Sequence, residues 1–198
     1  MEVVMQRARR VAHWGLWFGG ALVLLAALLI GVDVVLRKFF DASIGGADEL
    51  AGYALALGTT WALAATLLER AHIRIDSLYV LLTRPLRFTL DIAGLVLLVT
   101  FFALIAWHGS RVVAQSWTAE SRSQSALQTP LVIPQAIWLL GLIAFVAIGL
   151  LLLVHASMLA ARGQRAAVAK LISTRSAEEE VDDEVRDLRE RGTHQGER

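Results

Sequence analysis

Four long apolar segments, separated by polar stretches, dominate the pattern along the chain. Their approximate bounds are 11–36, 50–68, 88–107 and 134–159. A helix needs about 20 predominantly apolar residues to cross a hydrocarbon core of roughly 30 Å. Because a helix satisfies its backbone hydrogen bonds within one segment, each of these stretches is predicted to be a transmembrane helix. The pattern therefore predicts an all-α integral membrane protein with four spans, embedded in a lipid bilayer.

Composition supports the membrane class and excludes several others. Hydrophobic residues make up 56% of the 198 residues, whereas soluble domains contain about 45–50% apolar residues. The formal net charge is only +1, and no stretch interleaves basic with aromatic residues, so we expect no nucleic-acid partner. Because the chain has no cysteine, it offers neither a disulfide framework nor a thiolate ligand for a metal.

Basic residues near the span ends predict the orientation, because lysine and arginine concentrate in cytoplasmic connections. Eleven lie in the N-terminal tail, the second connection and the segment after the fourth span: Arg7, Arg9, Arg10, Arg70, Arg74, Arg84, Arg87, Arg162, Arg165, Lys170 and Arg175. The first and third connections together hold four: Arg37, Lys38, Arg111 and Arg122. This distribution predicts an N-in/C-in protein whose second connection is also cytoplasmic.

The stretches outside the spans divide the chain into three parts. Residues 1–10 are predicted to be a cytoplasmic tail, 11–160 a four-helix membrane domain, and 161–198 a charged cytoplasmic tail. Nine of the 18 acidic residues fall within 176–198, which has few large apolar side chains. Such a segment buries too little surface to offset its ordering entropy, so we expect the end of the tail to be disordered.

The second connection has its own helical pattern. Ile75, Leu78, Tyr79 and Leu82 recur at the spacing of one helix face. We therefore expect a short helix that lies along the cytoplasmic interface.

Two features of the spans predict contacts between residues. Asp33 precedes Arg37 by one helical turn, which is the favourable orientation for an ion pair. Two pairs of small residues have the four-residue spacing of close helix packing: Gly15 with Gly19, and Gly52 with Ala56.

The chain does not present the residue patterns that catalysis requires. No nucleophile–base pair, paired carboxylates, phosphate-binding glycine loop or metal-ligand cluster occurs at a suitable spacing, so we expect no enzyme. His13 and His155 fall near the cytoplasmic ends of the first and fourth spans, where two histidines can ligate a haem between helices. A haem-bearing membrane anchor of a respiratory enzyme is therefore an alternative to a subunit without a cofactor.

A mixed-charge cluster directly follows the second span and contains Glu69, Arg70, His72, Arg74 and Asp76. By itself this cluster is either a solvated connection at headgroup level or a docking surface for another subunit.

The six residues from Ala71 to Asp76 also resemble a family motif. They read Ala-His-Ile-Arg-Ile-Asp, close to the Gly-His-Ile-Arg-Val-Asp of the small membrane subunit of tripartite ATP-independent periplasmic (TRAP) transporters. The aromatic and basic stretch 35–40 and the acidic entry into the second span at Glu49 are similar to the same family. The Ser125-Ala126-Leu127 stretch, with Pro130 and Pro134 after it, is similar to the family's motif before the fourth span. At Gly45-Gly46-Ala47 the chain departs from the family, which often has tryptophan there.

The resemblance implies a role in transport. It implies a bacterial inner-membrane complex that imports an organic acid with a sodium gradient and without ATP. A periplasmic solute-binding protein would capture the acid, and a large multi-span subunit would carry the substrate and sodium sites. This chain would be its scaffold, with no cofactor and no substrate site of its own. A self-contained small transporter or channel is a further alternative.

The same resemblance assigns residues to the interfaces between subunits. The candidates are Glu49, His72, Arg74, Asp76, Ser125, Pro130 and Pro134. We expect the first connection's acidic end and the segment before the fourth span to shape the periplasmic face, and the charged cluster to fix the cytoplasmic one.

Overall fold

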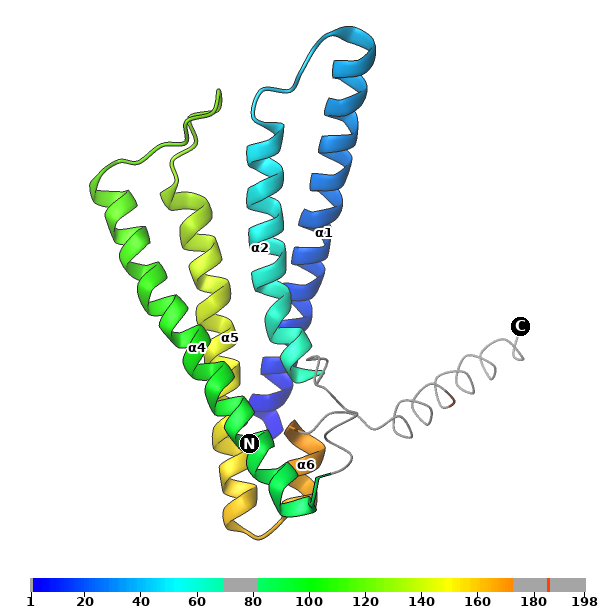
Figure 1. The fold of residues 1–198 in the computed structure, drawn as a ribbon, viewed down its shortest axis with the longest axis vertical. Helices are drawn as coiled ribbons and strands as arrows, with labels where there is room; N and C mark the ends of the chain where they lie inside the picture. The colour runs from blue at the N-terminus through cyan, green and yellow to red at the C-terminus, as the bar shows by residue number, and fades with distance from the viewer. Residues whose placement is uncertain (1, 70–81, 173–184, 186–198) are drawn as a thin grey trace.

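The computed structural model describes residues 2–69, 82–172 and 185. The helices in this part of the chain are α1 (Glu2–Phe40), α2 (Ala47–Leu68), α4 (Arg84–Thr118), α5 (Val132–Ala161) and α6 (Arg165–Ile172). Four of them, α1, α2, α4 and α5, are long and apolar enough to cross a membrane (Figure 1). No β-strand occurs among the described residues, so the predicted all-α fold with four spans is confirmed.

Local sequence determines where the spans begin. α2 begins after Gly46, whose φ of 91° lies in the left-handed region that glycine adopts without strain. The acidic side chains in its first turn, including Glu49, suit the positive end of the helix dipole. Pro85 and Pro134 lie in the first turns of α4 and α5, where a missing backbone N–H costs no intrahelical hydrogen bond.

The first span is longer than the apolar segment that predicted it. Residues 2–10, which hydropathy assigned to a tail, are helical and continue α1, and Met5 within them is buried. With 39 residues α1 is about 58 Å long at 1.5 Å per residue, roughly twice the hydrocarbon thickness. α1 therefore extends well beyond the hydrocarbon core. The helix predicted at 75–82 lies outside the described residues except for Leu82.

The four spans form an open row in the order α1, α2, α5, α4. α2 packs along both α1 and α5, and α4 packs along α5. Figure 1 shows the hairpins α1–α2 and α4–α5 meeting near α6 and diverging toward the connections 41–46 and 119–131. We call the end with these two connections the loop end. The opposite end, with α6 and the start of α1, is called the terminal end.

α1 and α2 approach each other backbone to backbone. A Cβ atom at Gly19 would overlap the Gly58 carbonyl oxygen, and one at Gly58 would lie 2.8 Å from the Gly19 carbonyl oxygen. One turn earlier, a Cβ atom at Gly15 would lie 2.7 Å from the Trp61 carbonyl oxygen. The close-packing role predicted for Gly15 and Gly19 is therefore confirmed. Among the described residues nothing lies within 4 Å of a Cβ atom placed at Gly52, so the close-packing role of Gly52 stays a prediction.

A polar contact joins the two hairpins. Trp61 of α2 donates its indole N–H to the Ile137 carbonyl oxygen of α5 at 3.1 Å. Gly141 leaves room for the ring, because a Cβ atom there would lie only 3.2 Å from the indole nitrogen. Hydrogen bonds between helices in a bilayer contribute about 0.6–2 kcal/mol each, so this contact supplements packing and does not replace it.

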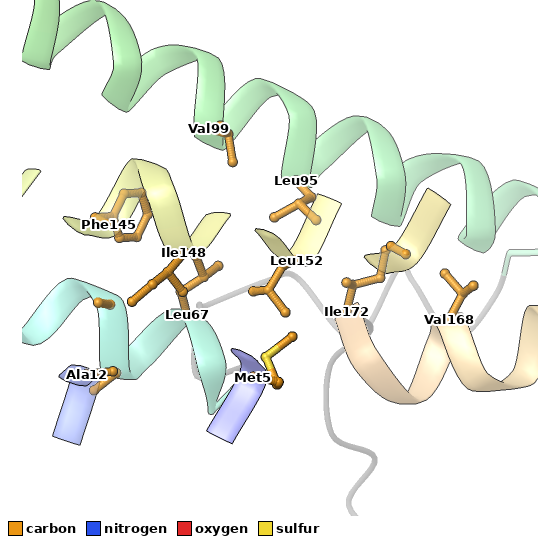
Figure 2. Packing of buried hydrophobic residues seen from close by; sticks show 13 residues of the cluster. Met5, Ala12, Leu67, Leu95, Val99, Phe145, Ile148, Leu152, Val168 and Ile172 are labelled. Carbon is orange, nitrogen blue, oxygen red and sulfur yellow. The ribbon is translucent and has the colours of Figure 1, made fainter. Parts of the chain in front are cut away.

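The buried apolar core lies toward the terminal end, where all five helices contribute to it (Figure 2). Phe145 of α5 is fully buried, and Leu95 and Val99 of α4 point toward α5. Val168 is also fully buried, so α6 covers the end of this core. The first part of the predicted charged tail is thus a packed helix, because its apolar face buries surface that the charged end cannot.

The glycine contact gives the first prediction. Replacing Gly19 by valine should destabilise the protein by about 1–3 kcal/mol, because the added side chain overpacks a site that has no room for a Cβ atom. The matched control is Gly20→Val, since nothing lies within 4 Å of a Cβ atom at Gly20. The check is the thermal midpoint of the detergent-solubilised variants, measured by size-exclusion chromatography after heating. Equal midpoints for the two variants would show that the α1–α2 contact is not tight.

Candidate functional site

At the loop end a single carboxylate joins α2 to the connection between α4 and α5. Glu49 accepts hydrogen bonds at Oε2 from the hydroxyl of Ser123, at 2.6 Å, and from the hydroxyl of Ser125. Its other oxygen, Oε1, accepts a hydrogen bond of 2.7 Å from the Tyr53 hydroxyl, one turn along the same helix. We call these four residues the Glu49 cluster. Hydrogen bonds to an ionised acceptor are stronger than those between neutral groups, so the cluster is a firm link between α2 and this connection.

The two serines are presented by a short hairpin, residues 121–131. The Ser123 N–H donates to the Thr129 carbonyl oxygen at 2.9 Å, and the Leu131 N–H donates to the Ser121 carbonyl oxygen at 3.0 Å. These two backbone hydrogen bonds pair the arms of the hairpin. The Glu49 cluster then fixes it against the first turn of α2.

A second carboxylate organises the connection between α1 and α2. Asp33 is only 2% exposed, and its Oδ1 accepts hydrogen bonds from the Ile44 N–H at 2.6 Å and the Ser43 hydroxyl at 3.0 Å. Its Oδ2 lies 2.6 Å from a guanidinium nitrogen of Arg37, so the predicted ion pair is confirmed. Arg37 also donates from Nε to the Ser43 hydroxyl at 3.2 Å. We call Asp33, Arg37, Ser43 and Ile44 the Asp33 cluster.

Glycines bring the two connections into contact. A Cβ atom at Gly46 would lie 2.5 Å from Cδ1 of Leu127, and one at Gly45 would lie 3.4 Å from Cβ of Ala126. Any side chain at 46 would therefore meet both the positive φ and the hairpin. The Gly45-Gly46-Ala47 sequence, where the chain departs from the family pattern, fits this close contact.

These arrangements join segments that are far apart in the sequence. The hydroxyls of the Glu49 cluster share one acceptor, whereas a nucleophilic hydroxyl needs its own base held by a further group. In the part of the chain that the structure describes, no three His, Cys, Asp or Glu side chains are grouped as metal ligands. A shallow cavity of about 430 Å³ borders the hairpin, lined in part by Trp117, Glu120 and Arg122. This end therefore offers a shaped polar surface.

The structure brings together some of the residues that sequence analysis singled out. Glu49 and Ser125 are in direct contact. Pro130 forms an isolated antiparallel bridge with Arg122, and Pro134 lies buried in the first turn of α5. The other three candidates, His72, Arg74 and Asp76, lie outside the described residues, so their interface role stays a prediction.

Sequence analysis did not find Ser123 or the cap that Asp33 provides for Ser43 and Ile44. Ser123 lies 74 residues from Glu49, so no local spacing signals the contact. Tyr53 carried a signal, because it lies one turn after Glu49 on the same helix face.

Comparison with known proteins adds to this picture. The fold and its clusters define a multi-pass helical membrane protein whose polar residues tie its own segments together. The family model for the DctQ component of tripartite ATP-independent periplasmic transporters matches residues 26–162, from within α1 to the end of α5. The chain belongs to this family of transporter components, as the resemblance implied. Searches of curated proteins and of solved structures found no match.

The family does not support the haem alternative. The family is one of transport components and not of enzymes. His13 accepts a hydrogen bond at Nε2 from the Trp17 indole at 2.9 Å, so this nitrogen already has a partner. His155 lies on α5 with Nδ1 buried and without a hydrogen-bond partner among the described residues.

The Glu49 cluster gives the second prediction. Glu49→Ala should release the hairpin 121–131, because two serine hydroxyls lose their shared acceptor. Amide hydrogen exchange in the hairpin should speed up at least roughly tenfold, as expected for the loss of a charge-assisted bond. The matched control is Asp48→Ala, since the Asp48 side chain is 83% exposed and its ion pair with Arg37 is long, at 3.7 Å. Unchanged exchange in Glu49→Ala would mean that the hairpin is held by its own backbone bonds.

Proposed function

We propose that this chain is the small scaffold subunit of a sodium-driven TRAP transporter in a bacterial inner membrane. The complex imports an organic acid that a periplasmic solute-binding protein captures. A large membrane subunit carries the substrate and sodium sites, and this chain holds that subunit in place without binding substrate. Proteins of this family work with a large membrane subunit and a periplasmic binding protein, which supports the proposal.

The observation that carries the scaffold role is the absence of charge in the middle of every span. The stretches 14–32, 50–68, 92–107 and 132–154 contain no Asp, Glu, Lys or Arg. A carboxylate substrate or a sodium ion at mid-membrane depth needs charged or strongly polar partners, because an unpaired charge there is costly. The middle of this protein therefore suits packing against a partner and does not suit transport.

The open row of spans supports the proposal that this chain holds a large membrane subunit in place. α1 exposes large apolar side chains along most of its length, including Trp17, which is 68% exposed, and Leu24, which is 62% exposed. The largest exposed residues at its loop end are Phe39 and Phe40. A row of helices leaves such faces uncovered, so a large apolar subunit can pack along them while the rest contacts lipid.

The distribution of basic residues supports placing the loop end in the periplasm. In this orientation the Glu49 cluster, with Ser125, Pro130 and Pro134, shapes a rigid face toward the binding protein. The residues His72, Arg74 and Asp76 then lie in the cytoplasmic connection, where we propose that they fix the chain against the large subunit.

The function is tested by purification and reconstitution. The tagged chain, isolated from native membranes in mild detergent, should bring a polytopic subunit of several hundred residues identified by mass spectrometry. Vesicles with both subunits and the binding protein should accumulate an organic acid only with an inward sodium gradient, and the chain alone should give no flux. Flux through the chain alone would restore the self-contained transporter or channel. Co-purification of haem and soluble redox subunits would restore the enzyme anchor.

The cytoplasmic interface gives a separate prediction. Arg74→Ala combined with Asp76→Ala should lower the yield of the two-subunit complex, because it removes both charges from the proposed contact. The matched control is Arg162→Ala with Asp48→Ala, which removes one basic and one acidic residue from exposed positions elsewhere. The measurement is the ratio of large to small subunit after purification. Equal ratios and equal uptake for both double variants would refute the docking role.

A further inference from the structure

A cavity of about 530 Å³ opens at the terminal end between α1, α2, α5 and α6. Its polar lining consists of Arg9, Arg10 and His13 from α1 and Glu69 from the end of α2. The lining contains two guanidinium groups and one carboxylate, so its net charge is positive even when His13 is neutral. The volume lies within the range of about 300–1,000 Å³ that is typical of small-molecule sites.

The rest of the lining is apolar. Met5 of α1, Leu68 of α2, Leu152 of α5 and Leu171 of α6 contribute to it. Trp14 also lines the cavity and is 72% exposed, and tryptophan is enriched at the level of lipid headgroups. The cavity therefore has a basic part and an apolar part, at the depth where the charged start of α1 gives way to its apolar span.

The basic groups are available to a ligand. Among the described residues, neither Arg9 nor Arg10 takes part in an ion pair or side-chain hydrogen bond. Both side chains are exposed. Guanidinium groups bind phosphate oxygens with two parallel N–H donors, so this pair suits a ligand that carries an anionic phosphate group.

His13 adds a third donor. Because its Nε2 accepts a hydrogen bond from Trp17, the neutral ring carries its proton on Nδ1. The Trp17 contact thus fixes the tautomer that donates from the other nitrogen.

We propose that this cavity binds an anionic phospholipid, with the phosphodiester on Arg9, Arg10 and His13 and the acyl chains along the apolar lining. A soluble phosphate compound would use only the basic part. A lipid uses both parts and reaches the cavity from the bilayer in which the protein sits. The terminal end is also the end predicted to be cytoplasmic, where anionic lipids give the leaflet a negative surface potential.

The test is native mass spectrometry of the purified chain, together with any subunit that accompanies it, titrated with phosphatidylglycerol or phosphatidylcholine. Wild type should retain phosphatidylglycerol in preference to phosphatidylcholine. Arg9→Gln with Arg10→Gln should weaken phosphatidylglycerol binding by about tenfold or more, as expected from losing charge-assisted hydrogen bonds to the phosphodiester. Arg7→Gln with Arg162→Gln removes the same charge from exposed positions that do not line the cavity, and should change binding less than about twofold.

Three outcomes would overturn the proposal. Equal losses in the two double variants would show only a general attraction of charge. Competition by soluble glycerol phosphate at the same concentration as the lipid would show that the apolar part is not used. Lipid binding only after removal of residues 173–198 would assign the cavity to the chain's own acidic tail. The titration does not depend on uptake activity, so its failure is distinguishable from failure of the proposed transport role.

Discussion

The backbone contact between Gly19 and Gly58 is the constraint on which the rest of the structure depends. Lipid chains are as apolar as leucine, so burial alone gives little reason for two spans to associate. Association needs close packing, and these glycines let α1 and α2 approach until carbonyl oxygens fill the space of a missing side chain. α2 is then placed so that Trp61, whose ring also contacts Phe18 of α1, reaches α5. The arrangement of the four spans in a row thus depends on the tight α1–α2 pair.

The two ends of this row are held by different chemistry. At the loop end, Asp33 and Glu49 each accept several hydrogen bonds and replace the regular structure that the connections lack. At the terminal end, α6 covers an apolar core to which every described helix contributes. Both carboxylates lie near the ends of their helices, and charged groups cost less at the ends of a span than at its middle. Between the ends, the middles of the spans contain no Asp, Glu, Lys or Arg, and they associate through close packing supplemented by the hydrogen bond from Trp61.

The features that could be predicted from the sequence are those that depend on periodic patterns within one helix. Span number, helical class and the Asp33–Arg37 pair could be predicted, because hydropathy and one-turn spacing act within a single helix. The Glu49–Ser123 contact could not, because it joins residues 74 positions apart through a hairpin whose geometry no local pattern encodes. The helix over residues 2–10 was not predicted either. Charged residues lower the average hydropathy of this stretch, although one of its faces is apolar and includes Met5. Gly15 and Gly52 carry the same spacing signal, yet within the part of the chain that the structure describes Gly15 lies against α2 and Gly52 has no neighbour within 4 Å of a Cβ atom.

The open row of spans explains why such a subunit would be rigid at its two ends and would lack charged residues in the middle of its spans. A partner subunit that moves substrate across the membrane needs a neighbouring surface that stays fixed during the movement. A subunit keeps a fixed position when it is anchored at both membrane–water interfaces. The Glu49 cluster joins α2 to the hairpin at the loop end, and the lipid that we propose for the cavity beside Arg9 would anchor the terminal end. Charges placed between these ends would create a competing ion path, so their absence from the span middles fits the proposed scaffold as well as the anchors do.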